Sequence, residues 1–173
     1  VDAASDPHTE SWLVIGDEAP VRFCFEDRLR EDAADVIAAL KARDCRIHLL
    51  SGDRTGPVEA VAAALGIDGW QAEMQPQDKI ARLEDLKAAG GTIAMVGDGI
   101  NDAPALAAAH VSISLASAAE VSQAAADFVL QGDRLAASVV ALDVSRGAKR
   151  RVLENFGLAA AYNAIAVPMA VAG

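Results

Sequence analysis

Short apolar runs and helical repeats alternate along most of this chain. Runs of strand length occupy six stretches: 12–15, 21–25, 47–50, 92–96, 111–115 and 128–130. Apolar residues recur at helical spacing in four others: 31–43, 58–65, 76–89 and 104–109. The first two runs flank a Gly-Asp-Glu-Ala-Pro segment and predict a hairpin or two adjacent strands. The alternation that follows predicts an α/β fold, with a parallel sheet and helices on both of its faces.

The last part of the chain follows a different pattern. Residues 135–154 repeat at helical spacing and include four basic residues between positions 146 and 151, whereas 155–173 contain no charge. An uncharged helix of 19 residues is roughly 28 Å long, close to the thickness of a bilayer core. The pattern predicts a stalk helix and the start of a transmembrane helix, with the chain before about residue 154 in the cytoplasm. A buried C-terminal helix is the alternative, because Ala and Gly are only weakly apolar.

Composition narrows the class of protein. Apolar residues make up 53% of the 173 residues, which is enough for a packed core. The net charge of −10 argues against nucleic-acid binding, because it repels phosphate backbones. Two cysteines, Cys24 and Cys45, cannot form a disulfide framework and indicate a reducing environment. The chain begins without Met and stops inside an apolar run, so we expect it to be a fragment of a longer protein.

The most specific pattern is the run Gly-Asp-Gly-Ile-Asn-Asp-Ala-Pro at 97–104. It places Asp98 at the end of a predicted strand and Asp102 at the start of a predicted helix, at the sheet edge where ligands bind in α/β folds. Paired carboxylates suit a hard cation such as Mg²⁺. Asp102 can also cap the helix that follows it. An ordinary acidic turn between strand and helix is the alternative.

Two weaker patterns accompany these aspartates. Ser51-Gly52-Asp53 follows the strand at 47–50 and offers a hydroxyl to a phosphoryl oxygen, although the same residue types are common in turns. Lys79 lies in the first turn of a predicted helix, where it is either a solvated residue or a phosphate-binding charge. Together, two carboxylates, a hydroxyl and a lysine are the components of a phosphoryl-transfer site.

These motifs, in this order, resemble the later part of the phosphorylation domain of P-type ATPases, a branch of the haloacid-dehalogenase-like superfamily. The resemblance extends from about residue 12 to the end of the chain. It rests on four segments: Asp27-Arg28-Leu29-Arg30, Ser51-Gly52-Asp53, Pro76-x-x-Lys79 and Gly97-Asp98-Gly99-x-Asn101-Asp102-x-Pro104.

The resemblance implies a haloacid-dehalogenase-like (Rossmann-like) parallel sheet over 12–134, after a lead-in at 1–11. A stalk helix would then occupy 135–154, and the start of a transmembrane helix 155–173. The same resemblance implies that Asp98 binds Mg²⁺ and that Asp102 and Asn101 support this site.

The remaining site residues are also implied by the family. Lys79 would neutralise the phosphoryl group transferred from ATP, and Ser51 would hydrogen-bond one of its oxygens, with Gly52 and Asp53 completing the motif. The family usually has Thr where Ser51 stands, which keeps the hydroxyl, and Asn where Arg54 stands.

A polar pair in the tail points to a subgroup. Tyr162-Asn163 resembles the Tyr-Asn pair of the copper-transporting heavy-metal subgroup, where it contributes to the ion site in the membrane. This resemblance implies transported Cu(I), Ag(I) or another heavy metal, and a multi-pass protein of the plasma (inner) membrane. The alternative is that Tyr162 lies at the membrane interface and Asn163 links helices.

One part of the family pattern has no counterpart in this chain. No Asp-Lys-Thr-Gly-Thr segment occurs, so the phosphorylated aspartate would lie elsewhere and the fragment would be inactive alone. The resemblance implies that its partners are the actuator, nucleotide-binding and membrane domains of the same polypeptide. Two other interpretations stay open: a free-standing phosphatase of the superfamily, or a membrane-tethered pseudo-enzyme.

Overall fold

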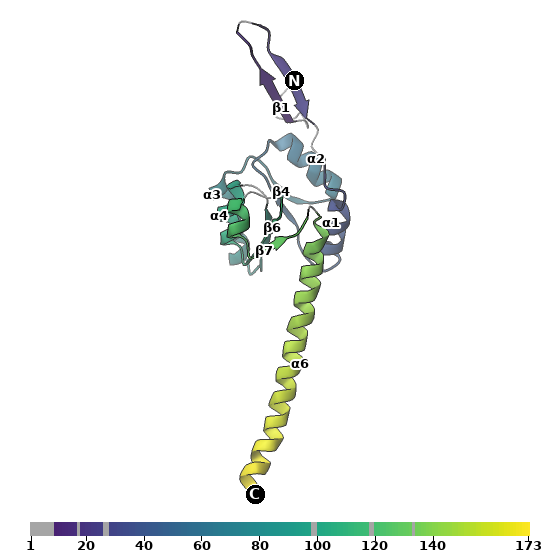
Figure 1. Cartoon of the computed structure of the whole chain (residues 1–173), viewed down its shortest axis with the longest axis vertical. Helices are drawn as coiled ribbons and strands as arrows, with labels where there is room; N and C mark the ends of the chain where they lie inside the picture. Colours follow the sequence, from purple (N-terminus) through teal and green to yellow (C-terminus); the bar gives the residue numbers. More distant parts are fainter. Residues whose placement is uncertain (1–8, 17, 26–27, 98–99, 118–119, 133) are drawn as a thin grey trace. The chain divides into compact units, whose positions relative to one another are not determined.

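The computed structural model describes residues 9–16, 18–25, 28–97, 100–117, 120–132 and 134–173. The chain divides into two compact units, Val1–Ala136 and Ala137–Gly173. The described strands all belong to the first unit, and the second unit is almost entirely one helix (Figure 1).

The predicted hairpin is confirmed at the start of the chain. β1 (Thr9–Leu13) pairs antiparallel with β2 (Val21–Phe25), and β1 starts three residues before the predicted run at 12–15. Trp12 lies opposite Arg22, whose guanidinium stands 6.0 Å from the centre of the indole ring. Glu10 binds the same arginine, with 2.5 Å between Oε2 and the Arg22 Nε.

A first βαβ unit follows the helix α1 (Ala33–Lys41). β3 (His48–Leu50) and β4 (Gly69–Gln71) are parallel, and α2 (Thr55–Leu65) connects them. The short β4 was not predicted, because a Gly-Trp-Gln segment has neither an apolar run nor a strand-like alternation.

Three more parallel strands form a second sheet in the order β5 (Ala94–Gly97), β6 (Val111–Leu115) and β7 (Phe128–Leu130). α3 (Pro76–Ala88) leads into β5, and α4 (Ala103–Ala108) connects β5 to β6. The helix α5 (Glu120–Ala125), between β6 and β7, was not predicted either.

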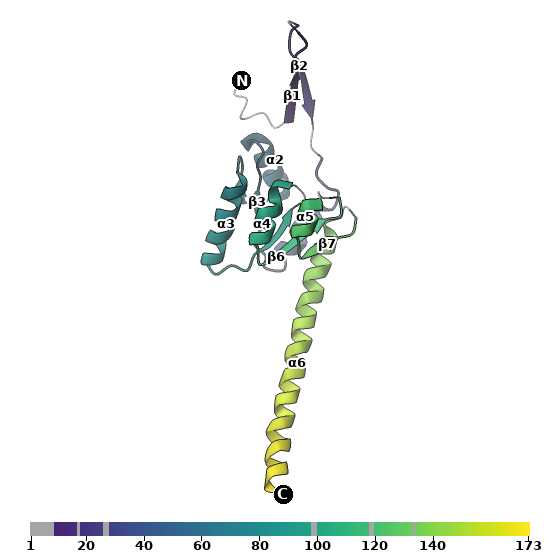
Figure 2. The ribbon, with the colours of Figure 1, turned by 60° about the vertical axis from the view of Figure 1, so that its left-hand side comes forward.

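The single parallel sheet expected from the sequence is present as two separate sheets. In the described part of the chain, β3 pairs only with β4, and β5 pairs only with β6. Helices do lie on both sides of the strands: Figures 1 and 2 show α3 and α4 together on one side, and Figure 1 shows α1 and α2 on the other. The α/β class is therefore confirmed. In the described residues, β3 and β5 each pair with another strand along one edge only.

The core of the first unit lies around β6 and the helices beside it. Its buried apolar side chains come from α1 to α4, from β6 and β7, and from Ile67 in the loop between α2 and β4. Two buried polar residues, Ser112 and Ser114, also lie on β6. The Ser112 N–H and hydroxyl donate to Oδ2 of Asp127 at 2.8 and 2.9 Å, which lowers the pKa of that carboxyl. These bonds link β6 to the residue that precedes β7.

The tail is one helix, α6 (Ala136–Ala172). The predicted stalk and transmembrane segments are continuous in it, and the helix runs on through Pro168. None of its residues is buried. Its first N–H, that of Ala136, donates to the buried carboxylate of Asp32 at 2.9 Å. By length and composition alone, α6 is able to cross a membrane.

Candidate functional site

The Ser51-Gly52-Asp53 turn begins directly after β3. The Ser51 N–H donates to the Gln71 carbonyl at 3.0 Å and extends the contact between β3 and β4 by one residue. The Ser51 hydroxyl donates to Oδ2 of Asp53 at 2.8 Å and accepts the Asp53 N–H at 3.1 Å. The turn therefore holds the Ser51 hydroxyl at the carboxyl end of β3.

The loop after β4 binds this turn through main-chain atoms. The Glu73 N–H donates to the Asp53 carbonyl at 2.8 Å, and the Met74 N–H donates to the Ser51 carbonyl at 3.0 Å. A Cβ on Gly52 would lie only 3.3 Å from the carbonyl oxygen of Met74, so glycine permits the close approach of the two loops. Since α3 starts just after this loop, the turn is tied to the start of α3.

Lys79 extends from the first turn of α3 into a mostly buried ion pair. Pro76 begins this helix, and the Asp78 carboxylate accepts the Gln75 N–H at 2.9 Å. The Nζ of Lys79 lies 2.6 Å from Oδ1 of Asp102, and the two side chains are 10% and 16% exposed. A charge-assisted bond of this length, shielded from solvent, fixes both groups.

Asp102 comes from the turn between β5 and α4. It stands at the N-cap position of α4, but the predicted cap is wrong, because its side chain makes no capping hydrogen bond. The Asp102 carboxylate forms an ion pair with Lys79 instead. A Cβ on Gly97 would stand 3.0 Å from the Cβ of Asp102, so the missing side chain at Gly97 makes room for the ion pair.

The predicted metal site is only partly within the described residues. Asp98, the expected Mg²⁺ ligand, lies outside them, and Asn101 is exposed on the turn η1 (Ile100–Asp102). In the ranges that the structure describes, no group of three or more His, Cys, Asp or Glu side chains forms a metal-binding cluster. Asp102 offers carboxylate oxygen, the donor that Mg²⁺ prefers, while its Oδ1 already accepts from Lys79.

The structure thus brings together residues from three of the predicted motifs. Lys79 and Asp102 contact directly, and Ser51 is connected to the start of α3 through the backbone of Met74. Glu73 and Met74 were missed by the motif analysis, because both bind the turn through backbone N–H groups that every residue except proline carries. Tyr162 and Asn163 belong to the second unit, where both side chains are exposed on α6.

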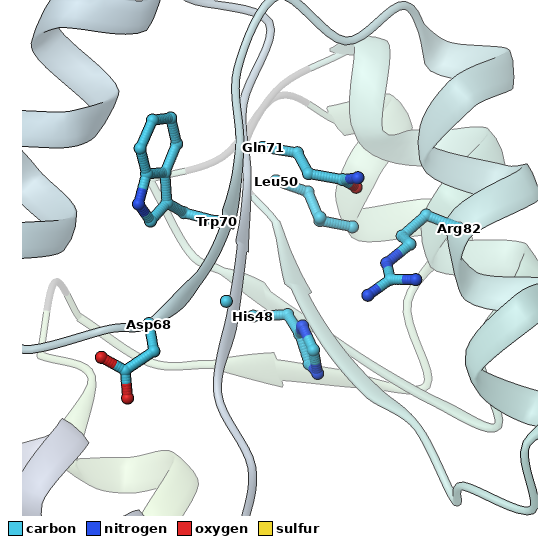
Figure 3. Close-up of a pocket in the computed structure, with 7 residues that line it drawn as sticks. His48, Leu50, Asp68, Trp70, Gln71 and Arg82 are labelled. Atoms are coloured by element: carbon cyan, nitrogen blue, oxygen red, sulfur yellow. The ribbon is translucent and has the colours of Figure 1, made fainter.

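A cavity of about 130 Å³ lies along β3 and β4 (Figure 3). His48 and Gln71 extend toward Arg82 of α3, whereas Trp70 points to the other side of the strands. The Nε of Arg82 is buried and has no hydrogen-bond partner in the described part of the chain. Burial lowers the pKa of His48 below its ordinary 6.5, and the positive charges of Arg82 and Arg46 lower it further.

The chain is similar in sequence to proteins of a known family. Residues 2–110 match the family model described as haloacid dehalogenase-like hydrolase. The nitrogen fixation protein FixI of Bradyrhizobium diazoefficiens is 54% identical over 145 residues, covering 84% of this chain and 20% of the relative. The probable copper-transporting ATPase SynA of Synechococcus elongatus is 39% identical over 164 residues, covering 94% of this chain and 21% of the relative.

The fold has a counterpart among solved structures. A zinc-transporting PIB-type ATPase in its E2.Pi state matches 99% of this chain with a TM-score of 0.85 and 30% identity, over 28% of that protein. The chain spans about a fifth of the length of the curated relatives that it matches.

Lys79→Met should destabilise the first unit by about 3–5 kcal/mol, because it leaves the Asp102 carboxylate buried without its counter-charge. The double variant Lys79→Met/Asp102→Leu should recover most of this loss, since no charge stays buried. Urea denaturation in detergent micelles, followed by the fluorescence of Trp12 and Trp70, measures the free energy of unfolding. The control Lys149→Met, at an exposed position of α6, should change it by less than about 0.5 kcal/mol. If the single and double variants lose the same free energy of unfolding, the Lys79–Asp102 ion pair does not account for the loss.

The lowered pKa of His48 should make the first unit less stable in mild acid. As the pH falls through 6.5, the unfolded chain takes up a proton at His48 before the folded chain does, so the free energy of unfolding decreases. His48→Gln should lose less stability between pH 7.5 and 5.5 than the wild type. Arg82→Gln should also reduce the loss, because it removes a repelling charge. Denaturation curves at several pH values test this, and identical pH dependence in wild type and His48→Gln would disprove it.

Proposed function

Because the chain belongs to the haloacid dehalogenase-like hydrolases and its homologues are heavy-metal P-type ATPases, we propose that it forms part of the phosphorylation domain of an ATP-driven metal pump. The observation that carries this proposal is the Lys79–Asp102 ion pair of 2.6 Å. It joins two of the phosphoryl-transfer motifs, and the Ser51 turn is tied to the start of the same helix through the backbone of Met74. The apolar helix α6 and the pump relatives favour this function over a free-standing phosphatase.

Lys79 and Ser51 would act on the phosphoryl group. The Lys79 ammonium would neutralise charge on the equatorial oxygens, and Asp102 would hold that ammonium in place. The Ser51 hydroxyl has a single proton, which it donates to Asp53 in the free site. To bind a phosphoryl oxygen, Ser51 would turn this proton away from Asp53, so phosphate and Asp53 would compete for one donor.

The phosphorylated aspartate would come from another segment of the same polypeptide. Two observations support this proposal: the sequence holds no Asp-Lys-Thr-Gly-Thr segment, and the match to this chain covers only 20% of the FixI relative. In the described residues, β3 and β5 each keep one edge that no strand pairs with. A strand that carries the aspartate would pair with the free edges of both β3 and β5, and it would join the two parallel sheets into one. The chain alone would then form no phosphoenzyme.

Mg²⁺ and ATP would complete the reaction. When bound, Mg²⁺ supplies positive charge to the transferring phosphoryl group. Asp98 would hold the ion directly, while Asp102, whose Oδ1 already binds Lys79, and the exposed Asn101 would support it from the neighbouring turn. Gly52 would keep the serine turn close to the loop after β4. The nucleotide-binding and actuator domains would be the partners that deliver and remove the phosphoryl group.

We also propose that 155–173 enter a plasma (inner) membrane as part of a multi-pass protein, with 1–154 in the cytoplasm. The 19 uncharged residues and the basic residues before them support this orientation. Tyr162 and Asn163 would then lie on the ion path, because polar side chains are rarely left facing lipid. Cu(I) is the proposed cargo, since one relative is called a probable copper-transporting ATPase.

Ser51→Ala should slow phosphorylation of the full-length protein by ATP roughly 10- to 100-fold, the loss expected for a hydrogen bond to a charged group. Ser51→Thr should stay close to the wild type, because it keeps the hydroxyl. Acid-stable phosphoenzyme formed from labelled ATP measures the rate, with Ser117→Ala, at an exposed position after β6, as the matched control. Phosphorylation of Ser51→Ala at the wild-type rate would refute its role, and no phosphoenzyme in the wild type would refute the function.

Asn163→Ala should reduce copper-stimulated ATP hydrolysis, while phosphorylation by inorganic phosphate persists without bound copper. The reason is that Asn163 would contact the ion and not the phosphoryl group. Asn155→Ala, at the start of the uncharged stretch, serves as the control for the same substitution in α6. Undiminished copper stimulation in Asn163→Ala would contradict its place on the ion path.

A further inference from the structure

We propose that Glu73 is a positioning residue that sets the conformation of the Ser51-Gly52-Asp53 turn. The proposal rests on the phosphoryl-transfer function argued above and adds a residue that the four motifs do not contain. Glu73 lies in the loop between β4 and α3 and has a φ of 56°. Among the non-glycine residues that the structure describes, only Asp44 and Glu73 have a positive φ.

The side chain of Glu73 binds Thr55, which lies two residues after the serine turn. Its Oε1 accepts the Thr55 hydroxyl at 2.9 Å and the Thr55 N–H at 3.4 Å. Thr55 is the first residue of α2, and the N-cap residue Arg54 makes no capping hydrogen bond with its side chain. Glu73 therefore supplies the helix cap from a separate loop, with a negative charge at the positive end of the helix dipole.

The backbone of the same loop binds the last and the first residue of the turn. The Glu73 N–H donates to the Asp53 carbonyl at 2.8 Å, and the next N–H, that of Met74, donates to the Ser51 carbonyl at 3.0 Å. Both Glu73 contacts depend on one conformation, because its N–H and its carboxylate must face the turn together. Left-handed backbone is unfavourable for a residue with a Cβ, so these bonds fix a conformation that Glu73 would otherwise rarely adopt.

The position of Glu73 links the two groups that would bind the phosphoryl oxygens. On one side it fixes the turn that carries the Ser51 hydroxyl, and on the other its loop leads into α3 and Lys79. A shift of this loop would move both groups, and a displacement of about 1 Å in a phosphoryl-transfer site can lower the rate about 100-fold. The contacts of Glu73 and its loop go to Ser51, Asp53 and Thr55, so Glu73 would act on the site only through these residues.

The test compares four variants at two levels. Glu73→Ala removes the carboxylate, Glu73→Gly also removes the left-handed strain, and Glu73→Gln keeps Oε1 as an acceptor. Glu59→Ala is the matched control, because Glu59 is an exposed residue of α2. Hydrogen exchange of the peptide 51–58 is measured on the whole chain in detergent micelles. Phosphoenzyme formation from inorganic phosphate is measured on the full-length protein.

We expect exchange in 51–58 to become roughly tenfold faster in Glu73→Ala and Glu73→Gly, and to stay near the wild-type rate in Glu73→Gln and Glu59→Ala. In the full-length protein, Glu73→Ala should need roughly tenfold more phosphate for half-maximal phosphoenzyme, with the maximal level changed less than about twofold. Rescue by Glu73→Gln distinguishes a positioned acceptor from a general folding defect, which would lower the maximal level instead.

Three results would overturn the inference. Unchanged exchange in Glu73→Ala would show that Glu73 does not hold the turn, and faster exchange with unchanged phosphate dependence would show that holding it has no effect on the site. Wild-type exchange in Glu73→Gly beside fast exchange in Glu73→Ala would assign the effect to backbone strain. If the wild type forms no phosphoenzyme, the proposed function fails, while the exchange experiment still decides whether Glu73 holds the turn.

Discussion

The first unit depends on one shielded ion pair, Lys79 with Asp102. It joins the first turn of α3 to the turn before α4, and these two helices pack on each other. The Asp102 side chain also needs space, because a Cβ at position 97 would crowd it. Gly97, which has no side chain, leaves that space open. A charge pair that is mostly out of water stabilises little by itself, but it strongly penalises any arrangement in which the partners separate. Its contribution is therefore to specify one alignment of the two turns.

The sequence predicted most elements and motifs because they follow from side-chain pattern. It did not predict β4, whose Gly-Trp-Gln segment has no apolar run, or α5, whose Glu-Val-Ser-Gln-Ala-Ala segment has only one large apolar residue. The cap expected from Asp102 was wrong for a physical reason: the same carboxylate can serve a helix end or a lysine, and only the packing of α3 on α4 decides. Glu73 escaped detection because its role depends on backbone conformation and on hydrogen bonds to residues about 20 positions earlier.

The two parallel sheets illustrate another limit of pattern analysis. Apolar runs indicate that strands exist, and their alternation with helices indicates that they are parallel, but neither indicates which strands are neighbours. In the described chain the pairing leaves one edge each of β3 and β5 free of strand partners. Parallel sheets are normally continuous and covered on both faces, so this arrangement agrees with a chain that spans a fifth of its relatives. The Ser51 turn and the Lys79–Asp102 pair are nevertheless both formed without a strand between β3 and β5.

The unbroken course of α6 has a mechanical consequence. Its 37 residues make a rod roughly 55 Å long, and a helix of this kind resists bending far more than a loop does. When such a rod turns about one end by 10°, the opposite end sweeps through roughly 10 Å, a distance comparable to the diameter of a helix. A small rotation at Ala136 is thereby amplified along α6 without any change in its internal hydrogen bonds. The displacement at the far end grows in proportion to the length of the rod, so a shorter helix would move less for the same angle.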